Sequence, residues 1–271
     1  MIVAVILPAS TIDPWKLFSP KKIATIIFAL AFIQIIGSML YHFLGVKTGA
    51  LLTGFIGGLI SSTATTAALA KQSQISSRNE SDFSWEILIF LSATFAMLVE
   101  GMVILILGTQ NTPYEIFVVF WGPILITGLG ILFKSKKTLR FVANKPHANF
   151  QWKPLLKLTA FIIFALGISK FLQNYLGQSS LLVLTFLISL FEIHGSVIAN
   201  IQLYNAKALD LRQLGTLISV SIFASYCSKL FLVYSMGNPV LKVKILRYSF
   251  ILFIALLISW LIFYFHAVPS K

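Results

Sequence analysis

Four ionisable side chains lie inside long apolar stretches of this 271-residue sequence, namely Glu100, Glu192, His194 and Lys229. A charge at the centre of a membrane-spanning helix costs about 3 kcal/mol on insertion scales, so each group needs a partner, a neutralising proton or a hydrated cavity. Carboxylates and an imidazole at that depth are groups that bind cations or pass protons in membrane proteins. The four residues therefore predict a polar core inside an apolar protein.

Glu100 and Lys229 occupy matching positions in two similar segments, LSATFAMLVEGMVIL and VSIFASYCSKLFLVY. Opposite charges at matching depth, on helices related by an internal repeat, predict that the two side chains face the bundle interior and meet directly or through water. Such a pair either fixes the register of two helices or forms part of a cation or proton path, and the sequence leaves both open. In the alternative arrangement, Lys229 pairs with Glu192 and Glu100 is protonated.

A second polar cluster lies within residues 180–205. Glu192, Ser196 and Asn200 recur at four-residue spacing and share one face of a straight helix, whereas His194 faces roughly the other way. We therefore expect that Glu192 and His194 do not form one chelate. A helix that only filled a lipid bundle would not need this stripe, which favours a polar cavity over a purely structural role.

Small and hydroxyl-bearing residues dominate another apolar segment, residues 49–70. Gly54 and Gly58 lead, at four-residue spacing, into the run SSTATT, and small residues at this spacing predict close helix packing. The run aligns with EIHGSV in the second copy of the repeat, so each copy places a polar run in its second helix. Three residues of the first run therefore join the predicted polar core, with hydroxyl groups bonded to backbone carbonyls as the structural alternative: Ser61, Ser62 and Thr63.

The composition defines the class of protein that must position these residues. Hydrophobic residues make up 58% of the chain and charged residues 11%, whereas a soluble domain carries about 25% charged residues. The net charge of +13 does not indicate nucleic-acid binding, because the basic residues lie mostly in short loops between apolar runs. No Walker loop, zinc spacing, nucleophile elbow or dinucleotide fingerprint occurs, so we expect neither an enzyme nor a cofactor.

Eight apolar segments are each long enough, at about 20 residues, to cross a bilayer as a helix. They predict an all-α membrane protein of about eight spans, at residues 23–44, 49–70, 85–108, 115–133, 155–176, 180–205, 213–236 and 246–266. The similar segments divide the chain into two four-helix repeats with short flanking parts: 1–19, 20–133, the basic linker 134–153, 154–266 and 267–271.

Four crossings return the chain to the side from which it started. The two repeats should therefore enter the membrane in the same direction and be related by an axis along the membrane normal. Counting Lys and Arg between eight such spans places most of them on the side of the two termini. The positive-inside rule then predicts that both termini are cytoplasmic.

Three strings carry a family resemblance: TIDPWKLFSPKKI, GALLTGFIGGLISSTATTAALAK and YLGQSSLLVLTFLISLFEIHGSV. They resemble the C-terminal membrane region of bacterial MgtC/SapB-type proteins, a region classed as domain of unknown function 4010. The resemblance implies a bacterial inner-membrane protein and matches Lys170 and Lys229 to basic positions of the family. Where the family usually has two aspartates this chain has Glu192 and His194, and where it has a basic residue this chain has Glu100.

Two functions from different classes remain open. The first is a transport- or channel-like protein that passes a small cation or proton through the polar core between the repeats. The second is a non-transporting membrane module that binds or regulates a partner, either a separately encoded MgtC-like subunit or further copies of this chain. The lipid bilayer is the expected environment in both cases.

Overall fold

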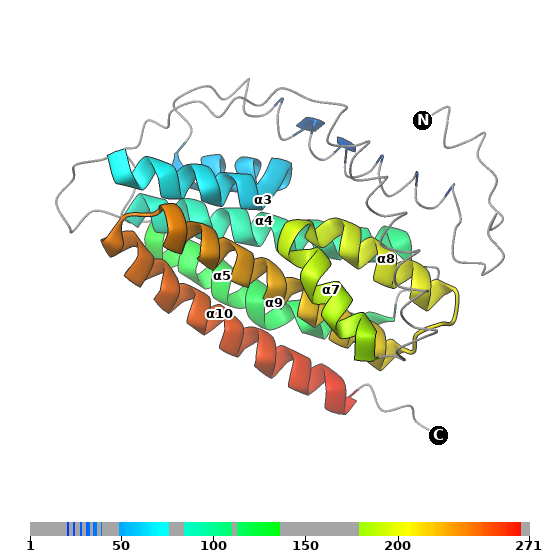
Figure 1. Ribbon diagram of the computed structural model, residues 1–271. Helices are drawn as coiled ribbons and strands as arrows, with labels where there is room; N and C mark the ends of the chain where they lie inside the picture. Colours follow the sequence, from blue (N-terminus) through cyan, green and yellow to red (C-terminus); the bar gives the residue numbers. More distant parts are fainter. Residues whose placement is uncertain are drawn as a thin grey trace.

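A computed structural model describes residues 49–75, 84–109, 113–135 and 179–266, together with isolated residues between 21 and 39. Most of the predicted spans 23–44 and 155–176, and the linker and terminal segments, lie outside the described residues. Within them every element is helical (Figure 1): α3 (Ala50–Ile75), α4 (Ser84–Gly108), the 3₁₀-helix η2 (Tyr114–Phe117), α5 (Val118–Ser135), α7 (Ser179–Phe191), α8 (Ile193–Asn205), α9 (Leu211–Met236) and α10 (Pro239–His266).

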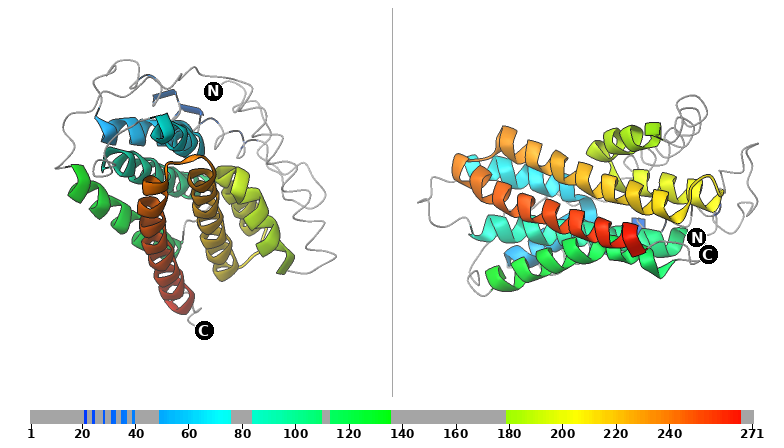
Figure 2. Two further views of the ribbon diagram at one scale, coloured as in Figure 1. Left: turned by 60° about the vertical axis from the view of Figure 1, so that its left-hand side comes forward. Right: turned by 90° about the horizontal axis from the view of Figure 1, so that it is seen from below.

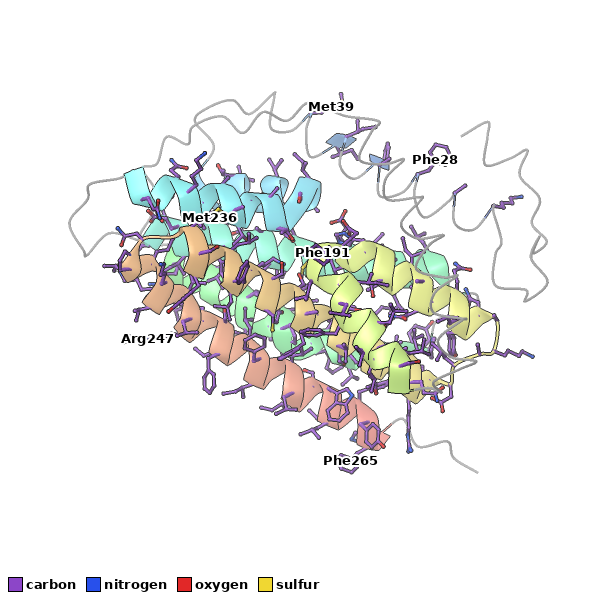
Figure 3. The ribbon with its side chains drawn as sticks, viewed as in Figure 1. Phe28, Met39, Phe191, Met236, Arg247 and Phe265 are labelled. Carbon is purple, nitrogen blue, oxygen red and sulfur yellow. The ribbon has the colours of Figure 1, made fainter. Side chains whose placement is uncertain are left out.

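The bundle has the surface expected of a protein in lipid. In the described part, five helical segments are long and apolar enough to cross a membrane: α3, α4, η2 with α5, α9 and α10. Large apolar side chains point outward, including Phe191 and Phe265 (Figure 3), which are 80% and 70% exposed. So large an apolar surface is stable only against hydrocarbon, which confirms an all-α membrane protein.

The predicted span 180–205 is not one helix. It breaks at Glu192, whose backbone is extended (φ −149°, ψ 100°), into α7 and α8. Leu181 and Leu203 belong to one small cluster of buried leucines, whereas in a straight helix they would be about 33 Å apart. Thr185 Oγ1 also donates to Asn200 Oδ1 across the two arms, at 3.4 Å. The segment is therefore a helical hairpin with Glu192 at its tip, which corrects the straight-span prediction (Figures 1 and 2).

The segment α3 folds back in the same way at Ser61, which is extended at φ −170° and ψ 105°. A methyl group placed on Gly57 would lie 2.7 Å from Thr65 Oγ1, although eight helical residues normally span about 12 Å. The 26 residues of α3 are thus divided between two arms, and the prediction of a straight span over residues 49–70 was wrong. Ser61 and Glu192 are the residues at which the two sequence repeats were aligned.

The hairpins start from opposite ends of the bundle. At one end, Asn238, which joins α9 to α10, donates its backbone N–H to Ser73 Oγ at the close of α3. At the other end, Asn205 Nδ2, at the close of α8, donates to the carbonyl of Gly108 at the end of α4. The α3 hairpin thus opens toward the first end and the α7–α8 hairpin toward the second (Figure 1).

The directions of α4 and α9 contradict a parallel repeat. These helices align in the sequence, yet α4 ends where α9 begins, so they cross the bundle in opposite directions. A hairpin returns to its own side and is not a crossing, so four apolar segments in each repeat do not give four crossings. The hairpins also change how many basic residues lie on each side of the membrane. Eight straight spans placed Lys134 and Lys244 on opposite sides, whereas in the structure both line one pocket.

Close packing fixes the first arm of α3 on α4. A Cβ atom on Gly54 would lie 2.5 Å from the carbonyl oxygen of Ile89, and one on Gly58 would lie 2.5 Å from Cα of Ala93. The backbones of the two helices are therefore in contact, as small residues at four-residue spacing allow in membrane helices.

Labelling from one side of the membrane distinguishes hairpins from straight spans. In a Cys227→Ser background, we predict that Gly49→Cys and Lys71→Cys react with an impermeant maleimide from one side, and that Ser180→Cys and Lys207→Cys react from the other. Straight helices would place the two members of each pair on opposite sides. Labelling of intact cells and of inverted vesicles measures this directly.

Gly58→Ala should lower the thermal stability of the purified protein, because the new methyl group meets the α4 backbone and the helices must separate. Overpacking of this kind costs about 1–3 kcal/mol. Gly49→Ala is the matched control, since nothing lies within 4 Å of its Cβ position. Equal Tm values for the two variants in detergent would contradict the packing described for α3 and α4.

Candidate functional site

The two hairpin tips are capped by their own side chains. Glu192 Oε1 accepts a hydrogen bond from the backbone N–H of His194 at 3.0 Å, and Ser61 Oγ accepts one from the N–H of Ala64 at 3.2 Å. Each side chain acts as an N-cap for the helical arm that follows it. The first arm of each hairpin also ends at its tip, where its last carbonyl groups have no partner further along the helix. Both tips therefore present backbone polarity inside an apolar bundle.

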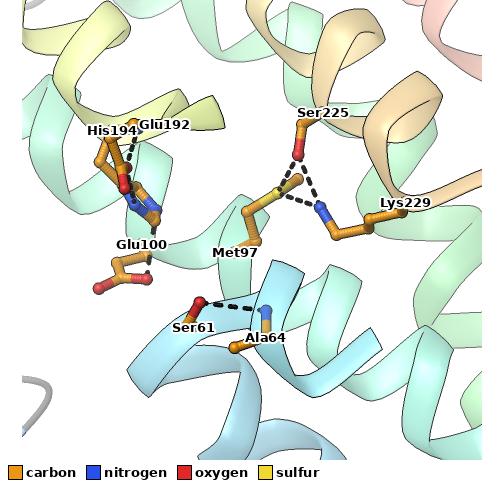
Figure 4. A network of polar contacts seen from close by, with 8 residues as sticks. All are labelled: Ser61, Ala64, Met97, Glu100, Glu192, His194, Ser225 and Lys229. Atoms are coloured by element: carbon orange, nitrogen blue, oxygen red, sulfur yellow. Dashed lines mark hydrogen bonds and ion pairs between the residues drawn. The ribbon is translucent and has the colours of Figure 1, made fainter. Parts of the chain in front are cut away.

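An imidazole joins two carboxylates beside the α7–α8 tip (Figure 4). His194 Nδ1 lies 3.2 Å from Glu192 Oε1, and His194 Nε2 lies 3.2 Å from Glu100 Oε2 on α4. The Glu100 side chain is 1% exposed, that of His194 15% and that of Glu192 38%. The three residues thus form a line from a partly accessible carboxylate to a fully buried one, which we call the carboxylate–imidazole line.

This arrangement corrects the expectation that Glu192 and His194 face apart. That expectation holds for residues two apart in a regular helix, but the extended backbone at Glu192 lets its side chain turn back over the first turn of α8. In the described part of the chain, neither carboxylate oxygen of Glu100 has a well-aligned hydrogen bond, although His194 is within ion-pair distance. Glu100 is therefore a buried acceptor that depends electrostatically on the imidazole.

Lys229 forms a separate polar group on α9 (Figure 4). Its Nζ donates to Ser225 Oγ at 2.6 Å and to Met97 Sδ at 3.0 Å, and it is fully buried. The predicted direct pair with Glu100 does not form, because Glu100 lies one turn beyond Met97 on α4 and contacts His194. Both charges do lie inside the bundle, since Glu100 and Lys229 are 1% and 0% exposed.

The remaining residues of the predicted polar core lie on both hairpins. Ser196 Oγ lies 3.3 Å from Ser221 Oγ on α9, and Asn200 accepts from Thr185. Ser62 is buried, and Thr63, next along the chain, is half-buried. The two later members of the predicted stripe, Ser196 and Asn200, therefore contact α9 and α7, whereas Glu192 contacts His194 at the tip.

Sequence reasoning missed Met97 and Ser225, the partners of Lys229. Ser225 precedes Lys229 by four residues, a spacing that places two side chains on one helix face and was a usable signal. Met97 gave no such signal, because a thioether in an apolar helix is an ordinary core residue. Only the tertiary arrangement, in which α4 and α9 both pack against α3 and α8, brings its sulfur to the ammonium group.

The family model described as "Domain of unknown function (DUF4010)" matches residues 29–237, and the chain belongs to this family. No curated protein and no solved structure matches the chain. The matched region includes both hairpin tips, Glu100 and Lys229. It therefore contains the whole candidate site.

His194→Ala should destabilise the protein strongly, because it leaves two carboxylates near each other in the bundle without the group between them. Breaking a buried ion pair costs about 3–5 kcal/mol. Adding Glu100→Gln, which removes one of the charges, should recover part of the lost Tm. By contrast, the charge-exchanged variant Glu100→Lys/Lys229→Glu should recover none of the Tm that its two single variants lose, because the two residues are not partners.

The control is His266→Ala, at an exposed position near the end of α10. Thermal unfolding of the purified variants, followed by size-exclusion chromatography, supplies the measurement. The ion pairs would be assigned to the wrong residues if the charge exchange between Glu100 and Lys229 restored the Tm of its single variants. The same conclusion requires that Glu100→Gln restores nothing in the His194→Ala background.

Proposed function

We propose that this protein is a membrane transport protein that moves protons, or a small cation in exchange for them, through the polar core at the hairpin tips. The observation that carries the proposal is the carboxylate–imidazole line, Glu192–His194–Glu100, with its two 3.2 Å contacts. Histidine can accept a proton at one ring nitrogen and release another from the second. Each ring nitrogen here faces a carboxylate that can supply or receive the proton.

The burial of the line supports movement along it. Glu192 is the most exposed of the three side chains and Glu100 the most buried, so a proton taken up at Glu192 can pass through the imidazole into the bundle. A structural ion pair would need only one carboxylate for one histidine. The second carboxylate adds a further desolvation cost. A site that only holds helices together has no need of this cost, whereas a site through which charge moves does.

The opposed hairpins support transport in a second way. Discontinuous helices at equivalent places in two inverted halves are the usual binding region of secondary transporters, because their free backbone groups replace water at mid-membrane. In this proposal the two sequence repeats are inverted, with Ser61 and Glu192 at equivalent tips. Each hairpin then separates the site from one side of the membrane, and small movements of the two open it to one side at a time.

The end at which α5 ends and α10 begins, which we call the basic end, is assigned to the cytoplasm. Five basic residues of the described helices lie there, whereas Lys207 and Arg212 lie at the opposite end. The positive-inside rule then places the end of α10 outside, in contrast to the cytoplasmic terminus expected from eight straight spans. The five residues are Lys71, Lys134, Lys242, Lys244 and Arg247.

Reconstitution of the purified chain into liposomes with an internal pH-sensitive dye tests the proposal. An imposed proton or cation gradient should change the internal pH faster than in empty liposomes. Glu192→Gln and His194→Gln should each slow this flux roughly tenfold or more, since each removes one step of proton transfer. His266→Gln, at the exposed end of α10, should leave the flux unchanged.

A folded, monodisperse protein that produces no flux for protons, Na⁺, K⁺ or Mg²⁺ would overturn the proposal. The same holds if the flux is present but insensitive to Glu192→Gln and His194→Gln. The first result would favour the other class, a membrane module that acts by binding an MgtC-like subunit or another copy of itself.

A further inference from the structure

A second polar feature lies far from the hairpin tips, at the basic end of the bundle. Here α4, α5 and α10 surround an open pocket of about 380 Å³, which we call the basic pocket. Its wall combines three cationic side chains, one phenol ring and two isoleucines: Lys134, Lys244, Arg247, Tyr248, Ile87 and Ile251.

The helices bring these cations together from distant parts of the sequence. Lys134 lies in the last turn of α5, where the carbonyl end of the helix favours a positive charge. Lys244 and Arg247 are three residues apart near the start of α10 and so share one helix face. Tyr248 adds the face of its ring, with Lys134 Nζ 6.0 Å from the ring centre.

The charge of the pocket favours an anion. The nearest acidic residue along the wall-forming helices is Glu86, which precedes Ile87 and is 1% exposed. One carboxylate against three cations leaves a net positive charge. Lys242, one turn away, is turned to another ring, with its Nζ 5.1 Å from the centre of Tyr234, and is therefore a basic neighbour outside the pocket.

The position of the pocket selects the kind of anion. Beyond it, α10 presents Leu246, Phe250 and Ile254, which are 56%, 64% and 42% exposed and face hydrocarbon. A ligand that places a phosphate among the cations and an alkyl chain along this face satisfies both parts of the surface. A soluble anion satisfies only the first part. Basic pockets between membrane helices on the cytoplasmic side bind anionic lipid headgroups for this reason.

We propose that the basic pocket is a binding site for the headgroup phosphate of an anionic phospholipid in the leaflet at the basic end. Lys134, Lys244 and Arg247 bind the phosphate, and the acyl chains lie along the exposed apolar face of α10. The site is independent of the transport proposal, because none of its residues belongs to the carboxylate–imidazole line. Bound lipid joins α5 to α10 at the end where the α3 hairpin opens.

Native mass spectrometry of the detergent-purified chain with added phosphatidylglycerol, cardiolipin or phosphatidylcholine tests this site. We expect retention of the two anionic lipids and weak retention of phosphatidylcholine. The variant Lys134→Gln/Lys244→Gln/Arg247→Gln should bind the anionic lipids roughly tenfold more weakly or worse, because each juxtamembrane cation contributes to attraction. The matched control Lys71→Gln/Lys207→Gln/Lys242→Gln removes the same charge elsewhere and should bind as the parent does.

Arg247→Gln alone is the second variant, because Arg247 is exposed and its change should not disturb folding. It should weaken binding of anionic lipid with an unchanged size-exclusion profile. Equal losses in the pocket variant and the control would show general surface attraction and overturn the site. Displacement of the lipid by millimolar inorganic phosphate or glycerol phosphate would instead identify a site for soluble anions, which also contradicts the proposal.

Discussion

Two helix interruptions, at Ser61 and Glu192, free backbone polar groups inside this apolar bundle. In hydrocarbon each unsatisfied N–H or carbonyl costs several kcal/mol, so irregular backbone is tolerated there only when protein groups cover it. Ser61 and Glu192 provide that cover by capping the arms that follow them. The other helices are arranged around these two points, with α4 and α9 packed against both hairpins.

The break at Glu192 also determines how the buried charges are distributed. An extended residue turns its carboxylate toward His194, and the imidazole then reaches Glu100 on α4. Glu100 is thereby paired with His194 and not with Lys229. The ammonium group is held instead by a hydroxyl and a thioether, which are neutral, so Lys229 forms a separate polar group from the carboxylate–imidazole line.

The hairpins have a consequence for the whole chain, because a segment that returns to its own side does not count as a crossing. Once two of the apolar segments fold back, α4 and α9 run in opposite directions. Basic residues from α5 and α10 then meet at one end of the bundle and form a single pocket. The opposite directions of α4 and α9 and the meeting of basic residues at one end thus depend on the same two extended residues.

The sequence by itself determined the membrane environment, the helical class and the family, because each depends on composition, length of apolar runs or local strings. It also identified Glu100 and Lys229 as buried, because a charge in an apolar run has few alternatives, and it placed Glu192 and His194 in the same polar core. Only the tertiary structure decided which of them meet and which helices are hairpins. An apolar run of about 25 residues gives the same sequence signal whether it crosses the bilayer or folds back. The hydrophobic effect depends on how much apolar area is removed from water and not on the direction of the chain.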